Sequence, residues 1–87
     1  MTKTISPTLL FRMDPTRNMA RFYFLAIEST LFGGSSLTRS WGRIGTKGQM
    51  RVDLFDTAAE AVEASSQLLQ RKFKRGYRQD AEEISPR

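Results

Sequence analysis

The hydrophobic pattern of the chain changes its period once, just after Phe55, and this change constrains the fold more than any other feature. Before it, apolar side chains occur in short runs between segments rich in glycine or proline, which is typical of β-strands and tight turns. After it, apolar side chains recur every three or four residues, as they do along one face of an α-helix. The pattern therefore predicts several strands followed by one helix.

The expected strands span residues 8–13, 20–30, 36–44 and 49–55. The links between them are short, and parallel pairing would require long crossovers, so antiparallel pairing is expected. The strand at 20–30 carries apolar side chains at both odd and even positions, and therefore on both of its faces. This predicts a place in the middle of the sheet, with both faces covered.

The strand at 49–55 alternates between apolar and polar side chains, which is typical of a half-buried strand. Arg51 and Asp53 are expected to point outward. The side chains expected to point toward the core are Met50, Val52 and Leu54.

The helix is expected near residues 57–75. Thr57 and Glu60 have the spacing of a capping box, in which each side chain bonds to the other residue's backbone N–H. Gly76 followed by Tyr77 fits a Schellman-type helix end. The expected apolar stripe consists of Ala58, Ala61, Val62, Ser65, Leu68, Leu69 and Phe73.

These elements predict an α+β fold, a four-stranded or slightly larger antiparallel sheet with one long helix packed on it. A chain of 87 residues fits one domain, expected at residues 1–78. The polar segment 79–87 is expected to form a fraying C-terminal tail.

Composition narrows the possible functions. The chain has no cysteine and no histidine, which excludes disulfides, thiolate or imidazole metal sites and every serine–histidine nucleophile arrangement. Its carboxylates are scattered without the context of an acid–base pair, so neither an enzyme, a cofactor nor a metal is expected. No segment has the length of a membrane span or the pattern of a signal peptide, so a cytoplasmic location is expected.

The charge of the chain favours anionic partners. Lys and Arg number 14 against 9 Asp and Glu, a net charge of +5. Nucleic acid is the first partner to consider, followed by acidic lipid or protein surfaces, although a soluble domain can also be basic without binding either. A basic cluster near the end of the helix has two interpretations, a binding patch or compensation of the helix dipole. It consists of Arg71, Lys72, Lys74, Arg75 and Arg78.

The segment from Trp41 to Gln49 is the most distinctive in the chain. Strand periodicity places Trp41 on one face with Arg39 and Arg43, beside a glycine-rich turn that carries Lys47. Arginine presents a planar fork of donors to phosphate, and an indole ring can stack on a sugar or base. The alternative is that the indole is a core side chain and the arginines form a solvated face.

Several segments resemble the WGR domain, a family found in DNA-dependent poly(ADP-ribose) polymerases and in short bacterial proteins. The resemblance extends from about Leu10 to Tyr77. The segments that carry it are Arg21-Phe22-Tyr23, Trp41-Gly42-Arg43-Ile44-Gly45, Gly48-Gln49 and Gly76-Tyr77.

The resemblance implies a DNA contact. In the polymerases the domain holds a DNA strand-break end, with the motif tryptophan against the sugar–phosphate backbone and the motif arginine bridging to DNA or to other domains. The matching positions here are Trp41 and Arg43, supported by the basic residue Arg21. Many relatives have asparagine immediately before that basic residue, whereas this chain has Ala20, so the asparagine contact does not carry over.

The expected function is therefore that of a nucleic-acid-binding module, with DNA ends or nicks as the partner and phosphate-backbone contacts that give little sequence preference. The alternative is a protein–protein interaction adaptor that uses the same face, because tryptophan and arginine are both enriched at protein interfaces. The residues expected to contact DNA are Trp41, Arg43, Arg21, Arg39, Lys47, Gln49, Arg51 and Tyr77.

Overall fold

The computed structural model describes residues 4–79 and confirms the predicted order of strands and helix. The elements are β1 (Thr4–Asp14), a short 3-10 helix η1 (Pro15–Arg17), β2 (Met19–Ser29), β3 (Ser35–Arg43), β4 (Gln49–Phe55) and α1 (Ala58–Lys74). The predicted tail, residues 79–87, lies outside the described residues except for Gln79.

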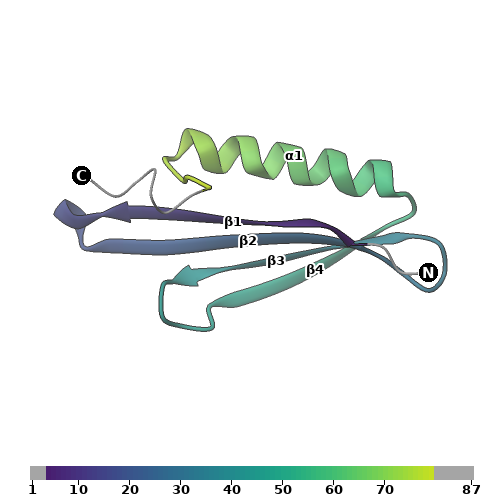
Figure 1. The fold of residues 1–87 in the computed structure, drawn as a ribbon, viewed down its shortest axis with the longest axis horizontal. Helices are drawn as coiled ribbons and strands as arrows, with labels where there is room; N and C mark the ends of the chain where they lie inside the picture. The colour runs from purple at the N-terminus through teal and green to yellow at the C-terminus, as the bar shows by residue number, and fades with distance from the viewer. Residues whose placement is uncertain (1–3, 80–87) are drawn as a thin grey trace.

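The four strands form one antiparallel sheet in the order β1-β2-β3-β4, as predicted. The helix α1 runs along one side of this sheet (Figure 1). The strand register aligns side chains into rows that cross the sheet, because Tyr23 on β2 lies opposite both Leu10 on β1 and Trp41 on β3. These rows decide which side chains meet the helix.

The core lies between α1 and the side of the sheet that the helix covers. Seven hydrophobic side chains are buried there: Leu10, Tyr23, Leu25, Ile27, Leu37, Ala61 and Tyr77. On the helix, Ala61 is fully buried, and Leu68 and Leu69 pack against the cluster. A short side chain at Ala61 is what lets the start of the helix approach the sheet closely.

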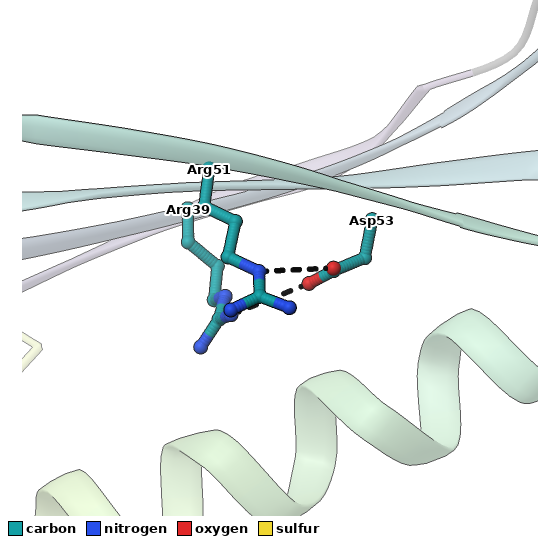
Figure 2. A network of polar contacts seen from close by, with 3 residues as sticks. All are labelled: Arg39, Arg51 and Asp53. Carbon is teal, nitrogen blue, oxygen red and sulfur yellow. Dashed lines mark hydrogen bonds and ion pairs between the residues drawn. The ribbon is translucent and has the colours of Figure 1, made fainter.

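The prediction for β4 was wrong, because its two faces are exchanged. Leu54 is 75% exposed and Met50 69% exposed, and both point away from the helix side. Asp53 lies opposite the core residue Leu37, so Asp53 and Arg51 are on the helix side, as Figure 2 also shows. Alternation defines two faces of a strand but does not say which one is covered, and here the pairing with β3 decides it.

The prediction that β2 is covered on both faces was half wrong. β2 does lie in the interior of the sheet. On its second face, however, no helix of the described chain packs over Phe22 and Phe24, although the ring of Phe22 lies close to Gly48 of the β3–β4 turn. They are half-buried because they lie beside Phe11 and Leu9 of β1, and such cross-strand pairs shield one another from water.

Both predicted helix ends are confirmed. The Thr57 hydroxyl accepts from Glu60 N at 3.2 Å, and the Glu60 carboxylate accepts from Thr57 N at 3.2 Å. At the other end Gly76 has a φ of +96°, and Tyr77 N donates to the Lys72 carbonyl at 3.0 Å, which completes a Schellman motif. This reversal turns Tyr77 back into the core.

The turn between β3 and β4 depends on Gly48, which has a φ of +69°. A Cβ atom there would clash with the Trp41 carbonyl oxygen. We expect Gly48→Ala to lower the free energy of unfolding by about 1–2 kcal/mol for the left-handed backbone, with a further loss from the clash. Gly45→Ala is the control, because Gly45 has a φ of +95° but a Cβ there would meet no atom of a non-adjacent residue within 4 Å. Equal losses in urea denaturation of the two variants would contradict the close approach.

Candidate nucleic-acid interface

The Trp-Gly-Arg motif occupies the end of β3, on the helix side of the sheet. The pairing of β2 with β3 is unbroken and places Tyr23 opposite Trp41 and Arg21 opposite Arg43. No bulge separates Trp41 from Arg43 in this pairing, so both share one face with Arg39. The predicted shared face is therefore confirmed.

Trp41 lies at the margin of the core. Its side chain is half-buried and packs against the buried cluster, with its ring 6.4 Å from the Tyr23 ring between centroids. The guanidinium carbon of Arg39 is 5.9 Å from the centroid of the indole ring, within the range of a cation–π contact. One part of the indole therefore stabilises the fold, and another part is open to a ligand.

A cavity of about 280 Å³ opens between α1 and strands β2 and β3, and we call it the basic cavity. Its lining residues are Tyr23, Arg39, Trp41, Leu68, Arg71, Lys72 and Arg75. A second hollow under the helix, of about 360 Å³ and lined by residues such as Leu25 and Val62, has no charged side chain in its lining. The concentration of cations makes the basic cavity the candidate site for an anion.

The ammonium group of Lys72 lies among aromatic rings and other cations. Its Nζ atom lies 4.5 Å from the ring centroid of Tyr23 and 5.2 Å from that of Tyr77. Burial lowers the pKa of Lys72, and the positive charges of Arg75 and Arg39 lower it further. The cavity therefore has an unfavourable excess of positive charge, which a bound anion would relieve.

Arg39 is held in place by a carboxylate. Its Nη2 atom lies 3.3 Å from Asp53 Oδ2, while Arg51 Nε donates to Asp53 Oδ1 at 3.1 Å (Figure 2). The Arg39 side chain is only 19% exposed, so this pair is shielded from solvent screening on that side. Arg51 is 63% exposed and shares the same carboxylate, which leaves it at the rim.

The predicted contact residues do not all gather in one place. Arg39 and Trp41 line the basic cavity, whereas Arg21 and Arg43 are exposed neighbours on the same side of the sheet. Tyr77 is 6% exposed and packs edge-on against the Tyr23 ring, so it supports the cavity from within the core. The residues of the predicted set that are exposed on the β3–β4 turn and on β4 are Lys47, Gln49 and Arg51.

Sequence reasoning did not assign the residues that α1 and β2 contribute to the cavity. The helical spacing of Arg71 and Arg75 was visible, but it was equally consistent with dipole compensation. The position of Tyr23 beneath the site follows from its pairing with Trp41, which a pattern within one strand does not contain. The missing residues are Tyr23, Leu68, Arg71, Lys72 and Arg75.

The described residues provide no sign of two other kinds of site. Within residues 4–79 no group of three or more acidic side chains is placed to hold a metal ion. The helix that these residues form is not long and apolar enough to cross a membrane.

The chain belongs to the WGR domain family, whose model matches residues 6–84. It is 57% identical over 67 residues to the protein y4dW of Sinorhizobium fredii, covering 77% of this chain and 33% of that protein. It is 40% identical over 62 residues to YehF of Escherichia coli, covering 71% of this chain and 22% of YehF. The chain thus spans a third or less of the length of these relatives.

A crystal structure of a protein from Bacteroides fragilis has a similar fold. The TM-score is 0.66 at 28% sequence identity, and the similarity covers 91% of this chain and 20% of that one. The four-stranded sheet with one packed helix is therefore also seen within a larger protein chain.

Proposed function

We propose that this domain is a binding module that holds DNA at ends or nicks through the sugar–phosphate backbone. The observation that carries the proposal is the half-buried Trp41 beside a cavity lined by four cationic side chains: Arg39, Arg71, Lys72 and Arg75. The exposed part of the half-buried indole offers a surface for a sugar or base, and the cations attract the adjoining phosphates. Membership of the WGR family supports the same partner.

The arrangement favours backbone contacts over base readout. The helix α1 packs along the sheet, and it turns Arg71, Lys72 and Arg75 toward the cavity. Within the described chain, no helix projects away from the sheet in the way that insertion into a major groove requires. Contacts to phosphate position a protein without reading bases, so weak sequence preference is expected.

The arrangement also favours binding over catalysis. The lining of the basic cavity contains aromatic and cationic side chains and no carboxylate. The chain as a whole contains no histidine or cysteine. Groups of this kind can hold an anion, but they do not form a pair that takes up and returns a proton near neutral pH.

A salt titration tests the proposal. If about four phosphates are neutralised, the logarithm of the DNA association constant should fall against the logarithm of salt concentration with a slope of about −3.6. Fluorescence anisotropy of a labelled duplex, measured at several salt concentrations, gives this slope. A slope near zero, or no binding at low salt, would reject the proposal and favour a protein-interaction adaptor that uses the Trp41 and Arg43 face.

A further inference from the structure

The positive charge around the basic cavity exceeds what the helix requires. The C-terminus of a helix carries the equivalent of roughly −0.5 charge, which one or two basic side chains suffice to balance. The cavity has two cations from the last turn of α1, Arg71 and Lys72, and a third, Arg75, from the C-cap of this helix. A fourth, Arg39, comes from β3. Dipole compensation explains none of the charge on the strand. Among the described residues, the carboxylate beside Arg39 is that of Asp53, and this carboxylate also pairs with Arg51.

Two buried donors near this charge have no partner in the described part of the chain. They are the Tyr23 hydroxyl and Arg39 Nε. Tyr23 is 3% exposed and lines the cavity, and Lys72 Nζ lies 4.5 Å from the centroid of its ring. A buried donor without an acceptor is unfavourable, and native structures seldom retain one without a reason. Both donors require an acceptor, which the surrounding cations do not provide.

We infer that the basic cavity is a binding site for a single phosphate group. The Tyr23 hydroxyl donates to one phosphate oxygen, and Arg39, Arg71, Lys72 and Arg75 surround the others. A phosphate presents oxygens in several directions, which suits donors that come from β2, β3 and α1 together. A carboxylate presents two oxygens in one plane and would leave some of these donors unpaired.

The size of the cavity limits what else can enter with the phosphate. Its volume of about 280 Å³ is near the lower end of small-molecule sites, which begin at about 300 Å³. That is room for a phosphate and an attached sugar, with Trp41 at their side, and not for a length of duplex. The phosphate group belongs either to a nucleic-acid strand or to a small phosphorylated molecule. In the first case the inference rests on the proposed function.

The lowered pKa of Lys72 supports this assignment. The groups that surround its ammonium are Arg71 and Arg75 on its own helix, Arg39 on β3 and Arg21 on β2, together with the rings of Tyr23 and Tyr77. All the charged members are cations, so a phosphate in the cavity would raise the pKa of Lys72 toward the ordinary lysine value.

Melting curves in inorganic phosphate test the site, with sodium chloride at equal ionic strength as the reference. The wild-type protein should show a rise in melting temperature that is specific to phosphate. Lys72→Met keeps the aliphatic stem and should abolish the rise. Lys74→Met makes the same change at an exposed position outside the cavity lining and should retain it.

Tyr23→Phe separates binding from folding. It removes only the unpartnered hydroxyl, so in the absence of phosphate its melting temperature should equal or exceed that of the wild type. Its affinity for phosphate, measured by calorimetry, should be roughly 10- to 150-fold weaker, as expected for the loss of one hydrogen bond to a charged group. The inference would be overturned if Tyr23→Phe bound phosphate as tightly as the wild type. It would also be overturned if phosphate raised the melting temperatures of Lys72→Met and Lys74→Met equally.

A competition with DNA identifies the source of the phosphate. If inorganic phosphate displaces a labelled nicked duplex from the wild-type protein but not from Lys72→Met, the site binds a phosphate of a nucleic-acid strand. Phosphate binding by a protein that does not bind DNA supports the site, assigns it to a small phosphorylated molecule and rejects the proposed function. DNA binding without a phosphate-specific effect on melting rejects the site and leaves the proposed function standing.

Discussion

Trp41→Ala is expected to weaken the binding of nicked or blunt-ended DNA by about 1–3 kcal/mol, the typical contribution of one aromatic stacking surface. At 25 °C this is a loss of affinity of roughly five- to 150-fold. The physical reason is that the half-buried indole stands beside the cations of the basic cavity, where a sugar and its phosphate would be held together. Equilibrium titration of the variant with a labelled duplex measures the loss.

The Trp41→Ala variant also needs a stability measurement, because part of its ring packs against the core. The loss in unfolding free energy should be smaller than for a fully buried side chain, and the variant should remain folded at the temperature of the titration. Trp41→Phe is the matched control, since it keeps an aromatic face and should bind with intermediate affinity. Unchanged DNA affinity in folded Trp41→Ala protein would remove the assigned role of the indole.

Leu37→Ala should be among the most destabilising substitutions in the chain, with a loss of about 2–5 kcal/mol in the free energy of unfolding. Leu37 is 1% exposed and lies between α1 and the sheet, so truncation leaves a cavity as well as losing apolar burial. Small domains have a total stability of about 5–15 kcal/mol, so this single change removes a large part of it. Urea denaturation followed by circular dichroism gives the value.

Leu54→Ala is the control for that experiment and a test of the face that β4 presents. Leu54 is 75% exposed and lies on the side of the sheet away from α1. Its truncation should change the unfolding free energy by less than about 0.5 kcal/mol. A loss comparable to that of Leu37→Ala would instead agree with the sequence prediction that Leu54 points into the core.

The elements of the fold could be predicted from the sequence because each is encoded locally. The capping box of Thr57 and Glu60 and the Gly76 stop are interactions between residues close in sequence, and both are present. The alternation of residues 49–55 likewise predicted a β-strand correctly. Which of its two faces is covered depends on pairing with β3, where Asp53 is needed beside Arg39, and that information lies outside the strand.

The same distinction explains how much of the candidate site was predicted. Arg39, Trp41 and Arg43 come from one strand, so their shared face follows from a period of two. The basic cavity combines that strand with Tyr23 of β2 and with the last turns of α1. To predict this cavity one must know which turn of the helix lies over which row of side chains in the sheet, and a single sequence does not provide that information.

The most direct test of DNA binding at this site uses Trp41 as its own reporter, because it is the only tryptophan in the chain. Intrinsic fluorescence is followed while nicked or blunt-ended duplex is added at low salt, with closed circular DNA as the comparison. We expect a saturable change in Trp41 emission with the ended or nicked DNA, reversed by added salt and smaller with the circle. Tight DNA binding that leaves Trp41 emission unchanged, or no binding to any of these duplexes, would contradict the proposed role of Trp41 and its cavity.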